Sequence, residues 1–301
     1  MMKLISGLAA LCVAFTFGWS AASAQGLSPT LQKIKDSGTI TIGNRDSSVP
    51  FSYLDDSQKP IGFSLDLCNL VVARIKTKLG LPGLKVAYQA VNSSNRIPLV
   101  KNGTVDIECG STANTIPRQE EVAYSVIFYA PQFKWISLKS SGLKTTDDLK
   151  GKTVAVTQGT NTSQFVAKLN TEKGLGMKIL QGKDHAESFL LVEIGRAAAF
   201  MEDDILLAGL KATAGSPDNF AFLTDAFPSD PYGVMMSKGD PDFKRLVDDA
   251  LTEAMKSGLY DKLYAKWFES PIPPKNINLN FPQSEKLREL IKVPSDKANG
   301  Q

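Results

Sequence analysis

The pattern of hydrophobic and polar positions along the chain alternates between two periods. Short runs rich in β-branched residues, such as 39–44 (TITIGN), predict strands, and runs with apolar residues three or four positions apart, such as 63–80, predict helices. We expect strands over 39–44, 84–91, 104–110, 152–160, 177–182 and 197–202, and helices over 27–38, 63–80, 95–103, 161–174, 185–196 and 203–215. Repeated strand–helix alternation is typical of α/β folds with parallel sheets.

Two extended stretches, 125–142 and 227–239, interrupt this alternation, and residues 240–270 are almost wholly helical in pattern. The proline-rich residues 271–282 predict an irregular segment. Two extended crossings would carry the chain from one lobe to a second and back. We therefore expect lobe 1 to comprise 25–128 and 233–301 and lobe 2 to comprise 129–232, with hinge crossings near 128–133 and 228–232.

The N-terminal residues have the order of a secretory signal peptide. Lys3 precedes an apolar run that ends near Gly18, and the small-residue stretch AASA follows. The run is shorter than the roughly 20 residues that span a bilayer, and Leu11 directly before Cys12 argues against a lipoprotein. We predict cleavage after Ala24 and export to the periplasm.

Charge and cysteine content limit the remaining possibilities. Residues 1–24 contain Lys3 as their only charged residue, so 33 basic and 31 acidic residues remain after them. This balance, without a basic block, argues against a nucleic-acid partner. An exported protein can form a disulfide, but Cys68 lies in an apolar helical run and Cys109 at the end of a strand. We therefore expect two free, buried thiols.

The stretch CGSTANTIPRQEE, residues 109–121, could form a cysteine nucleophile, a phosphate loop or a carboxylate clamp. A nucleophilic thiol must be accessible, whereas Cys109, which His185 would have to activate, ends a buried strand. One glycine without a following Lys-Ser/Thr does not make a phosphate loop, and the chain has too few His and Cys residues for a typical zinc site. The carboxylate clamp stays open at this point, and we expect no metal and no cofactor.

Several motifs together resemble the family 3 solute-binding proteins of bacterial ABC importers for polar amino acids. The motifs are VPFSYLDD, IGFSLDLCNLVVARI, NGTVDIECGSTANTIPRQEE and GRAAAFMEDD, in this order, and NRIPL, KDHAESF and SPIPPKNINLNF are most similar to the glutamate/aspartate-binding subgroup. The resemblance covers nearly the whole chain after residue 24. It implies a type II periplasmic-binding-protein fold, α/β and two-lobed, with two hinge crossings and a mostly helical C-terminal tail. It also implies a non-enzymatic, monomeric protein that delivers one amino acid to a membrane permease–ATPase complex.

The resemblance also implies which residues bind the invariant part of an amino acid. Arg118 matches the clamp for the α-carboxylate, because the planar guanidinium fits a carboxylate with two hydrogen bonds. Ser111 matches a main-chain contact, and Asp203 matches the acid that receives the ammonium group. Three structural roles stay open: Arg118 could pair with the acidic residues after it, Ser111 could cap a short helix, and Asp204 could be the acid that caps the next helix.

Four further matches favour an acidic ligand. Arg45 stands where glutamine-binding members have a carboxylate. A hydrogen bond to a charged group contributes roughly 1.5–3 kcal/mol, which is enough for an arginine here to favour an acidic ligand over an amide. Ser93, Arg96 and His185 match side-chain contacts of the glutamate/aspartate subgroup. A solvated Arg96 and a structural His185 are the alternatives. If His185 charges near neutral pH, we expect the affinity for an acidic ligand to fall as the pH rises.

Two positions depart from the pattern and leave the ligand's identity open. Ala113 replaces a serine or threonine near the α-carboxylate. Asn161 replaces a threonine, and we expect its amide to bind the ligand in place of the lost hydroxyl. A binder of glutamine or asparagine, a periplasmic dehydratase of the prephenate/arogenate type on the same fold, and an amino-acid sensor remain alternatives.

Overall fold

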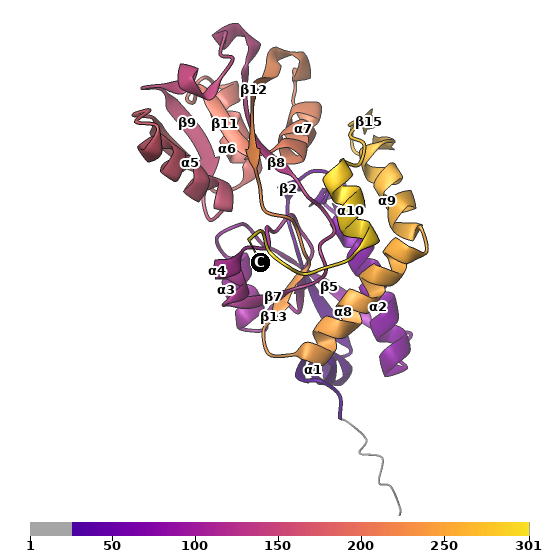
Figure 1. Cartoon of the computed structure of the whole chain (residues 1–301). Helices are drawn as coiled ribbons and strands as arrows, with labels where there is room; N and C mark the ends of the chain where they lie inside the picture. Colours follow the sequence, from indigo (N-terminus) through magenta and orange to yellow (C-terminus); the bar gives the residue numbers. More distant parts are fainter. Residues whose placement is uncertain (1–25, 301) are drawn as a thin grey trace, which may run out of the picture.

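The chain folds into two lobes, each built on one five-stranded sheet (Figure 1). The structure is a computed structural model that describes residues 26–300. The predicted signal peptide and its cleavage site lie outside these residues. Between residues 26 and 300, no helix combines the length and apolar character that crossing a bilayer requires.

The sheet of lobe 1 combines three parallel strands with two strands at one edge. In spatial order its strands are β5 (Lys85–Ala90), β1 (Thr39–Asn44), β6 (Ile107–Glu108), β13 (Met235–Ser237) and β7 (Val122–Tyr124). β5, β1 and β6 are parallel, whereas β13 pairs antiparallel with both β6 and β7. β13 enters from the opposite direction because it follows the return crossing from lobe 2.

Helices cover both faces of this sheet. They are α1 (Pro29–Ser37), α2 (Phe63–Leu79), α3 (Arg96–Lys101), α4 (Ile116–Gln119), α8 (Pro241–Lys256), α9 (Leu259–Phe268) and α10 (Glu285–Lys292). α1, α2, α8 and α9 pack over one face in a large core, and Val100 of α3 packs on the other face with residues of β7 and β13. Two small sheets complete the lobe: β2 (Ser47–Ser48), β3 (Ser52–Leu54) and β4 (Pro60–Ile61), and β14 (Pro271–Ile272) with β15 (Ile277–Asn278).

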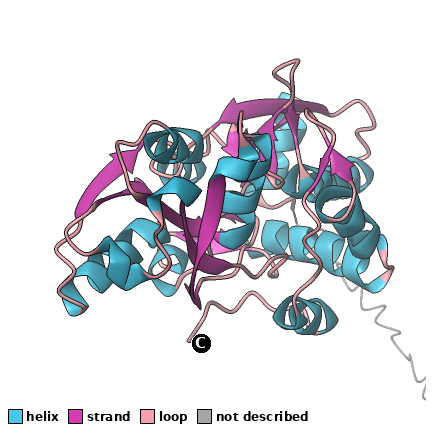
Figure 2. Cartoon of the chain, turned by 90° about the horizontal axis from the view of Figure 1, so that it is seen from above, coloured by secondary structure: helices cyan, strands magenta, loops and turns pink. Residues whose placement is uncertain are grey.

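Lobe 2 repeats the same plan. Its sheet has the order β10 (Lys178–Gly182), β9 (Thr153–Thr157), β11 (Ala199–Asp203), β8 (Gln132–Leu138) and β12 (Phe220–Pro228). α5 (Asn161–Glu172) packs on one face, and α6 (His185–Glu193) and α7 (Asp204–Thr213) pack on the other. Short 3₁₀ turns lie at Lys139–Ser141, Thr146–Leu149 and Pro217–Asn219. Seen from above, helices flank the strands on both sides (Figure 2).

The two crossings between the lobes run side by side and hydrogen-bond to each other. The Phe128 amide donates to the Tyr232 carbonyl at 2.9 Å, and the Tyr232 amide donates to the Tyr129 carbonyl at 2.8 Å. All three rings are buried. The extended character predicted for 125–142 and 227–239 is therefore present where the chain passes between the lobes.

Every strand and helix predicted up to residue 270 is present, and the structure adds elements that were not predicted, among them β3, β7, β12 and α10. The expectation of free thiols is wrong because Cys68 and Cys109 form a disulfide, with 6.4 Å between their Cα atoms. Cys68 faces inward from α2 and Cys109 directly follows β6. Packing of α2 against the sheet brings together two residues that are 41 positions apart in sequence.

The C-terminal strap, residues 293–300, runs from α10 back toward α3 and α4 (Figure 1). The Ser295 carbonyl accepts from the Ile127 amide at 2.8 Å, and Asn299 donates to the Ser229 carbonyl at 2.9 Å. The strap thus binds residues that flank both crossings between the lobes.

Candidate functional site

The ligand-binding residues predicted from the sequence lie close together, where the carboxyl ends of the parallel strands in the two lobes face each other. Arg45 follows β1, Ser111 follows β6, His185 follows β10, and Asp203 ends β11. Open α/β sheets present their ligand sites at this edge of the sheet. Six of the eight predicted residues are at most 6% exposed: Arg45, Ser93, Arg96, Ser111, His185 and Asp203.

Two buried arginines form the wall of the cleft in lobe 1. Arg45 donates from Nη2 to the Ser93 hydroxyl at 3.2 Å, and Arg96 donates from Nη1 to the Thr112 hydroxyl at 2.6 Å. Thr112 in turn donates to Glu108 at 2.6 Å. Arg96 is thus a buried residue held by a hydrogen-bond chain, which excludes the solvated role that the sequence left open.

Each of the two arginines has a buried nitrogen atom that its surroundings leave without a hydrogen-bond partner. Burial lowers the pKa of both, and Arg118 and Arg45 lower that of Arg96 further, to about 9, whereas Glu108 opposes the lowering at Arg45. Arg45 Nη1 and Arg96 Nε are buried and have no hydrogen-bond partner within residues 26–300. A buried N–H group without a partner is costly, so these atoms are suited to an anion in the cleft.

Arg118 joins the two lobes at the rim of the cleft. Its guanidinium donates to the Ala113 carbonyl at 3.0 Å in lobe 1 and to the Gly159 carbonyl at 3.1 Å in lobe 2. Glu121, its candidate surface partner, instead pairs with Lys101 at 2.8 Å. The guanidinium is therefore directed toward the cleft and not toward an acidic neighbour.

Ser111 does not cap the helix that carries Arg118. Thr115 is the N-cap residue of α4 and accepts from the Arg118 amide. The Ser111 hydroxyl is buried without a hydrogen-bond partner in the described chain. The cap alternative is therefore wrong, and a polar group of Ser111 remains available in the cleft.

Asp203 faces the cleft from lobe 2 between two hydroxyl donors. Ser229 donates to Oδ1 at 2.5 Å, and the Tyr232 hydroxyl donates to Oδ2. Asp204, the alternative acid, accepts from the amides of Gln132 and Ile205. The two adjacent aspartates therefore have different roles. Asp204 binds the main chain around the start of α7, whereas Asp203 lies among the cleft residues.

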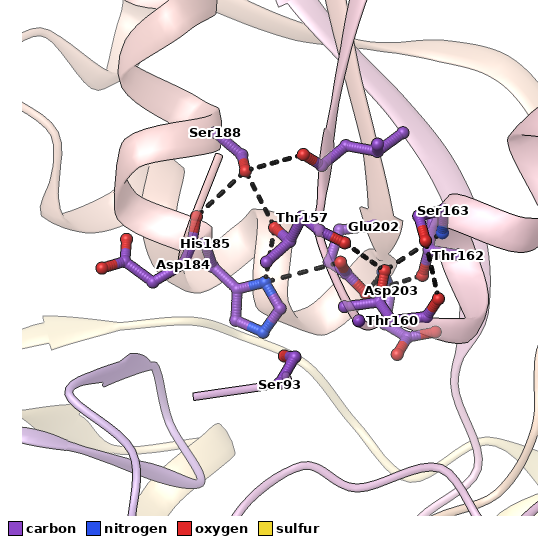
Figure 3. Close-up of polar contacts among 12 residues, drawn as sticks. Ser93, Thr157, Thr160, Thr162, Ser163, Asp184, His185, Ser188, Glu202 and Asp203 are labelled. Atoms are coloured by element: carbon purple, nitrogen blue, oxygen red, sulfur yellow. Dashed lines mark hydrogen bonds and ion pairs between the residues drawn. The ribbon is translucent and has the colours of Figure 1, made fainter. Parts of the chain in front are cut away.

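His185 is the first residue of α6, and its side chain points into the cleft (Figure 3). Its Nδ1 lies 3.1 Å from the Thr157 hydroxyl and 3.4 Å from Oε2 of Glu202. Burial, together with the charges of Arg45 and Arg96, lowers the pKa of His185 well below its usual value of 6.5. The premise that His185 itself charges near neutral pH is therefore wrong.

Asn161 lies apart from the buried group, at the mouth of the cleft. Its amide donates to Asp230 at 3.0 Å. It lines a groove of about 810 Å³ together with Ser93, Arg118 and Gly159. Across residues 26–300, no group of three or more His, Cys, Asp or Glu side chains is arranged to hold a metal ion.

Comparison with known proteins identifies the family of this chain. Residues 40–270 match the model of the bacterial extracellular solute-binding proteins, family 3. The chain belongs to this family.

Its relatives include proteins that are similar over nearly their whole length. The chain is 50% identical over 273 residues to an L-glutamate/L-aspartate-binding protein of Pseudomonas aeruginosa, covering 90% of each chain. It is 45% identical over 269 residues to a glutamate/aspartate import solute-binding protein of Escherichia coli, covering 89% of each. An ancestral amino acid-binding protein, a precursor of cyclohexadienyl dehydratase, superposes with a TM-score of 0.67 at 29% identity, covering 79% of this chain and 99% of that one. The architecture of this family 3 protein is the type II periplasmic-binding-protein fold that the sequence predicted.

Three residues of the cleft were not predicted from the sequence: Glu108, Thr112 and Glu202. Glu108 and Thr112 stand inside the quoted motif CGSTANTIPRQEE or directly before it, but their link to Arg96 depends on how α3 packs on the sheet. Glu202 directly precedes Asp203 on β11. Glu202 could have been found from the sequence because it is an acidic residue at the end of an otherwise apolar strand, which is an unusual place for a charge.

Proposed function

We propose that the chain is the substrate-binding component of an ABC importer and captures glutamate or aspartate by closure of its two lobes. The observation that carries this proposal is the pair of unpartnered arginine atoms, Arg45 Nη1 and Arg96 Nε, buried in one cleft with the carboxylate of Asp203. An acidic amino acid offers two carboxylates and one ammonium group. Buried charges of this kind are stable only when each one is paired.

Each predicted residue has a role in this proposal. Arg118 and Ser111 bind the α-carboxylate, and Asp203 binds the ammonium group. Arg45, Ser93, Arg96 and His185 bind the side-chain carboxylate, and Asn161, at the mouth of the cleft, adds an amide contact to the ligand. The names of the glutamate/aspartate-binding relatives support the choice of an acidic ligand.

The proposal includes the organisation of the protein. Lobe 1 comprises 25–128 and 233–301, lobe 2 comprises 129–232, and the hinges lie near 128–133 and 228–232. The protein works as a periplasmic monomer, released from its signal peptide after Ala24, and presents its closed form to a permease–ATPase complex. It has no catalytic activity, and the thiol considered as a nucleophile, Cys109, is bound to Cys68 in a disulfide.

Calorimetry on protein that has been unfolded and refolded, so that copurified ligand is lost, tests the proposal. Glutamate or aspartate should bind at least about tenfold more tightly than glutamine, because an amide leaves arginine donors facing donors. Tighter binding of glutamine would contradict the assignment of Arg45. Turnover of prephenate or arogenate would contradict the absence of catalysis.

A further inference from the structure

Glu202 is a buried carboxylate whose two oxygens have different surroundings. Oε1 accepts a hydrogen bond from the Thr162 hydroxyl at 2.9 Å. Oε2 is buried without a hydrogen-bond partner in the described part of the chain, and it lies 3.4 Å from Nδ1 of His185. A buried carboxylate oxygen without a donor is a poor place for negative charge. When Glu202 binds a proton, Oε2 is therefore the oxygen that carries it.

The position of this proton determines what the other nitrogen of His185 can do. A neutral imidazole has one N–H and one acceptor nitrogen. When Glu202 is protonated, Nδ1 can accept from Oε2 or from the Thr157 hydroxyl, and Nε2 carries the hydrogen. When Glu202 is ionised, Nδ1 donates to it, and Nε2 becomes an acceptor.

Nε2 is the nitrogen of His185 that faces lobe 1. In Figure 3, Nδ1 is turned to Thr157 and Glu202, and the other ring nitrogen is turned toward Ser93 of lobe 1. Ser93 accepts the hydrogen bond from Arg45, one of the two arginines with an unpartnered N–H group. His185 Nε2 thus lies on the side of the cleft where the proposed function places the side chain of the ligand.

The charged groups around the pair come from both lobes. Arg45 and Arg96 from lobe 1 face both His185 and Glu202, while Asp203 adjoins Glu202 on β11. Asp184, before His185, and Glu108 interact with Arg45. Burial raises the pKa of Glu202 to about 7 although Thr162 and the arginines oppose the increase, and it keeps His185 neutral. Within the pair, the proton that titrates near neutral pH is therefore bound by Glu202 and not by His185.

We propose that Glu202 is a specificity-determining positioning residue that sets the tautomer of His185, so that acidic ligands bind together with one proton. This inference rests on the proposed function. With Glu202 protonated, Nε2–H donates to a ligand carboxylate. With Glu202 ionised, Nε2 can accept from a ligand amide but repels a carboxylate, and the negative charge of Glu202 adds to the repulsion.

Binding measurements between about pH 6 and pH 8.5 test the inference, and glutamine, which carries the same amino group as glutamate, controls for the titration of that group. The affinity for glutamate should fall about tenfold per pH unit at the upper end of this range, and calorimetry in buffers of different ionisation enthalpy should show uptake of about one proton. The affinity for glutamine should change much less. Glu202→Gln, which keeps a donor toward Nδ1, should bind glutamate without proton uptake and without this pH dependence.

The matched control is Glu193→Gln, the same change at an exposed acid on α6, which should keep the wild-type pH dependence. Glutamate binding by the wild-type protein without proton uptake at the upper end of the pH range would overturn the inference. So would a Glu202→Gln variant that still takes up the proton.

The tautomer can also be observed without any ligand. His185 is the only histidine of the chain, so ¹⁵N NMR of the untagged protein reports one imidazole. Its Nδ1 should change from acceptor to N–H as the pH rises through about 7, and Glu202→Gln should remove this change. An unchanged tautomer in the wild-type protein would overturn the inference. Failure of the proposed function would instead appear as absence of saturable glutamate binding at every pH.

Discussion

Gly159 in lobe 2 lies directly against the main chain at Ser93 in lobe 1. A Cβ atom built on Gly159 would be 2.8 Å from the carbonyl carbon of Ser93 and 2.8 Å from the amide nitrogen of Ser94. Gly209 approaches Val49 in the same manner, with its built Cβ 2.5 Å from the Val49 carbonyl oxygen. The two lobes therefore touch at positions that admit no side chain.

The first prediction concerns this contact. Gly159→Ala should weaken the binding of every amino acid by about tenfold or more, because the added methyl group prevents full closure. Gly174→Ala is the matched control. Both glycines have positive φ, +75° and +59°, but a Cβ on Gly174 has no atom within 4 Å. Calorimetry of both variants checks the prediction, and equal affinities would contradict it.

The second prediction concerns Arg118, which donates to both lobes. Arg118→Ala should abolish measurable binding of all amino acids. Arg118→Lys should retain little, because lysine lacks the planar fork that binds a carboxylate with two hydrogen bonds. Arg196→Ala, at an exposed position of lobe 2, should bind normally. A selective loss of acidic ligands in Arg118→Ala would assign Arg118 to the side chain of the ligand instead.

Arg45 should control the choice between acid and amide. Arg45→Met removes the charge while retaining much of the buried volume, so glutamate affinity should fall by at least about tenfold, the value of one charged hydrogen bond. Glutamine affinity should fall less, because the amide loses no ionic partner. The ratio of the two dissociation constants, from parallel calorimetric titrations, is the measurement. An unchanged ratio would contradict the assigned role.

The disulfide should stabilise lobe 1. Closing a loop between residues 41 positions apart corresponds to about 4 kcal/mol in the chain-entropy model, or about 10 °C in Tm for a protein of this size. Reduction with dithiothreitol should lower the Tm of the wild-type protein by this amount. The double variant Cys68→Ser/Cys109→Ser should melt at the lower temperature with or without reductant. A wild-type Tm unaffected by complete reduction would contradict this contribution.

Asp203 should limit binding at low pH. Burial and the neighbouring Glu202 raise the pKa of Asp203 well above 3.8, although Ser229 and Tyr232 donate to it. Only the ionised carboxylate attracts an ammonium group, so the affinity for every amino acid should fall as the pH falls through this raised pKa. Calorimetry toward acidic pH should show this loss in the wild-type protein. Asp203→Asn should bind weakly with no acidic decline; a decline equal to that of the wild-type protein would place the titrating group elsewhere.

Local patterns were enough to predict most of the secondary structure and the edge of each sheet where the site lies. The period of apolar positions encodes strands and helices directly, and the carboxyl ends of parallel strands indicate the cleft. α10 was missed because its eight residues follow an irregular segment and only one of them, Leu287, is buried. The candidate residues Arg45, Arg96, Ser111 and Asp203 were recognised because each begins, follows or ends a predicted element and matches a position of a known family.

The sequence by itself therefore determined the α/β alternation, the two crossings and the residue types that an acidic amino acid requires. Only the tertiary structure decided that Cys68 reaches Cys109, that Thr112 and Glu108 hold Arg96, and that Glu202 lies beside His185. These contacts join segments that are distant in sequence or lie on different elements. Protonation also depends on tertiary structure, because the burial that keeps His185 neutral and raises the pKa of Glu202 arises only when the segments that surround them fold together.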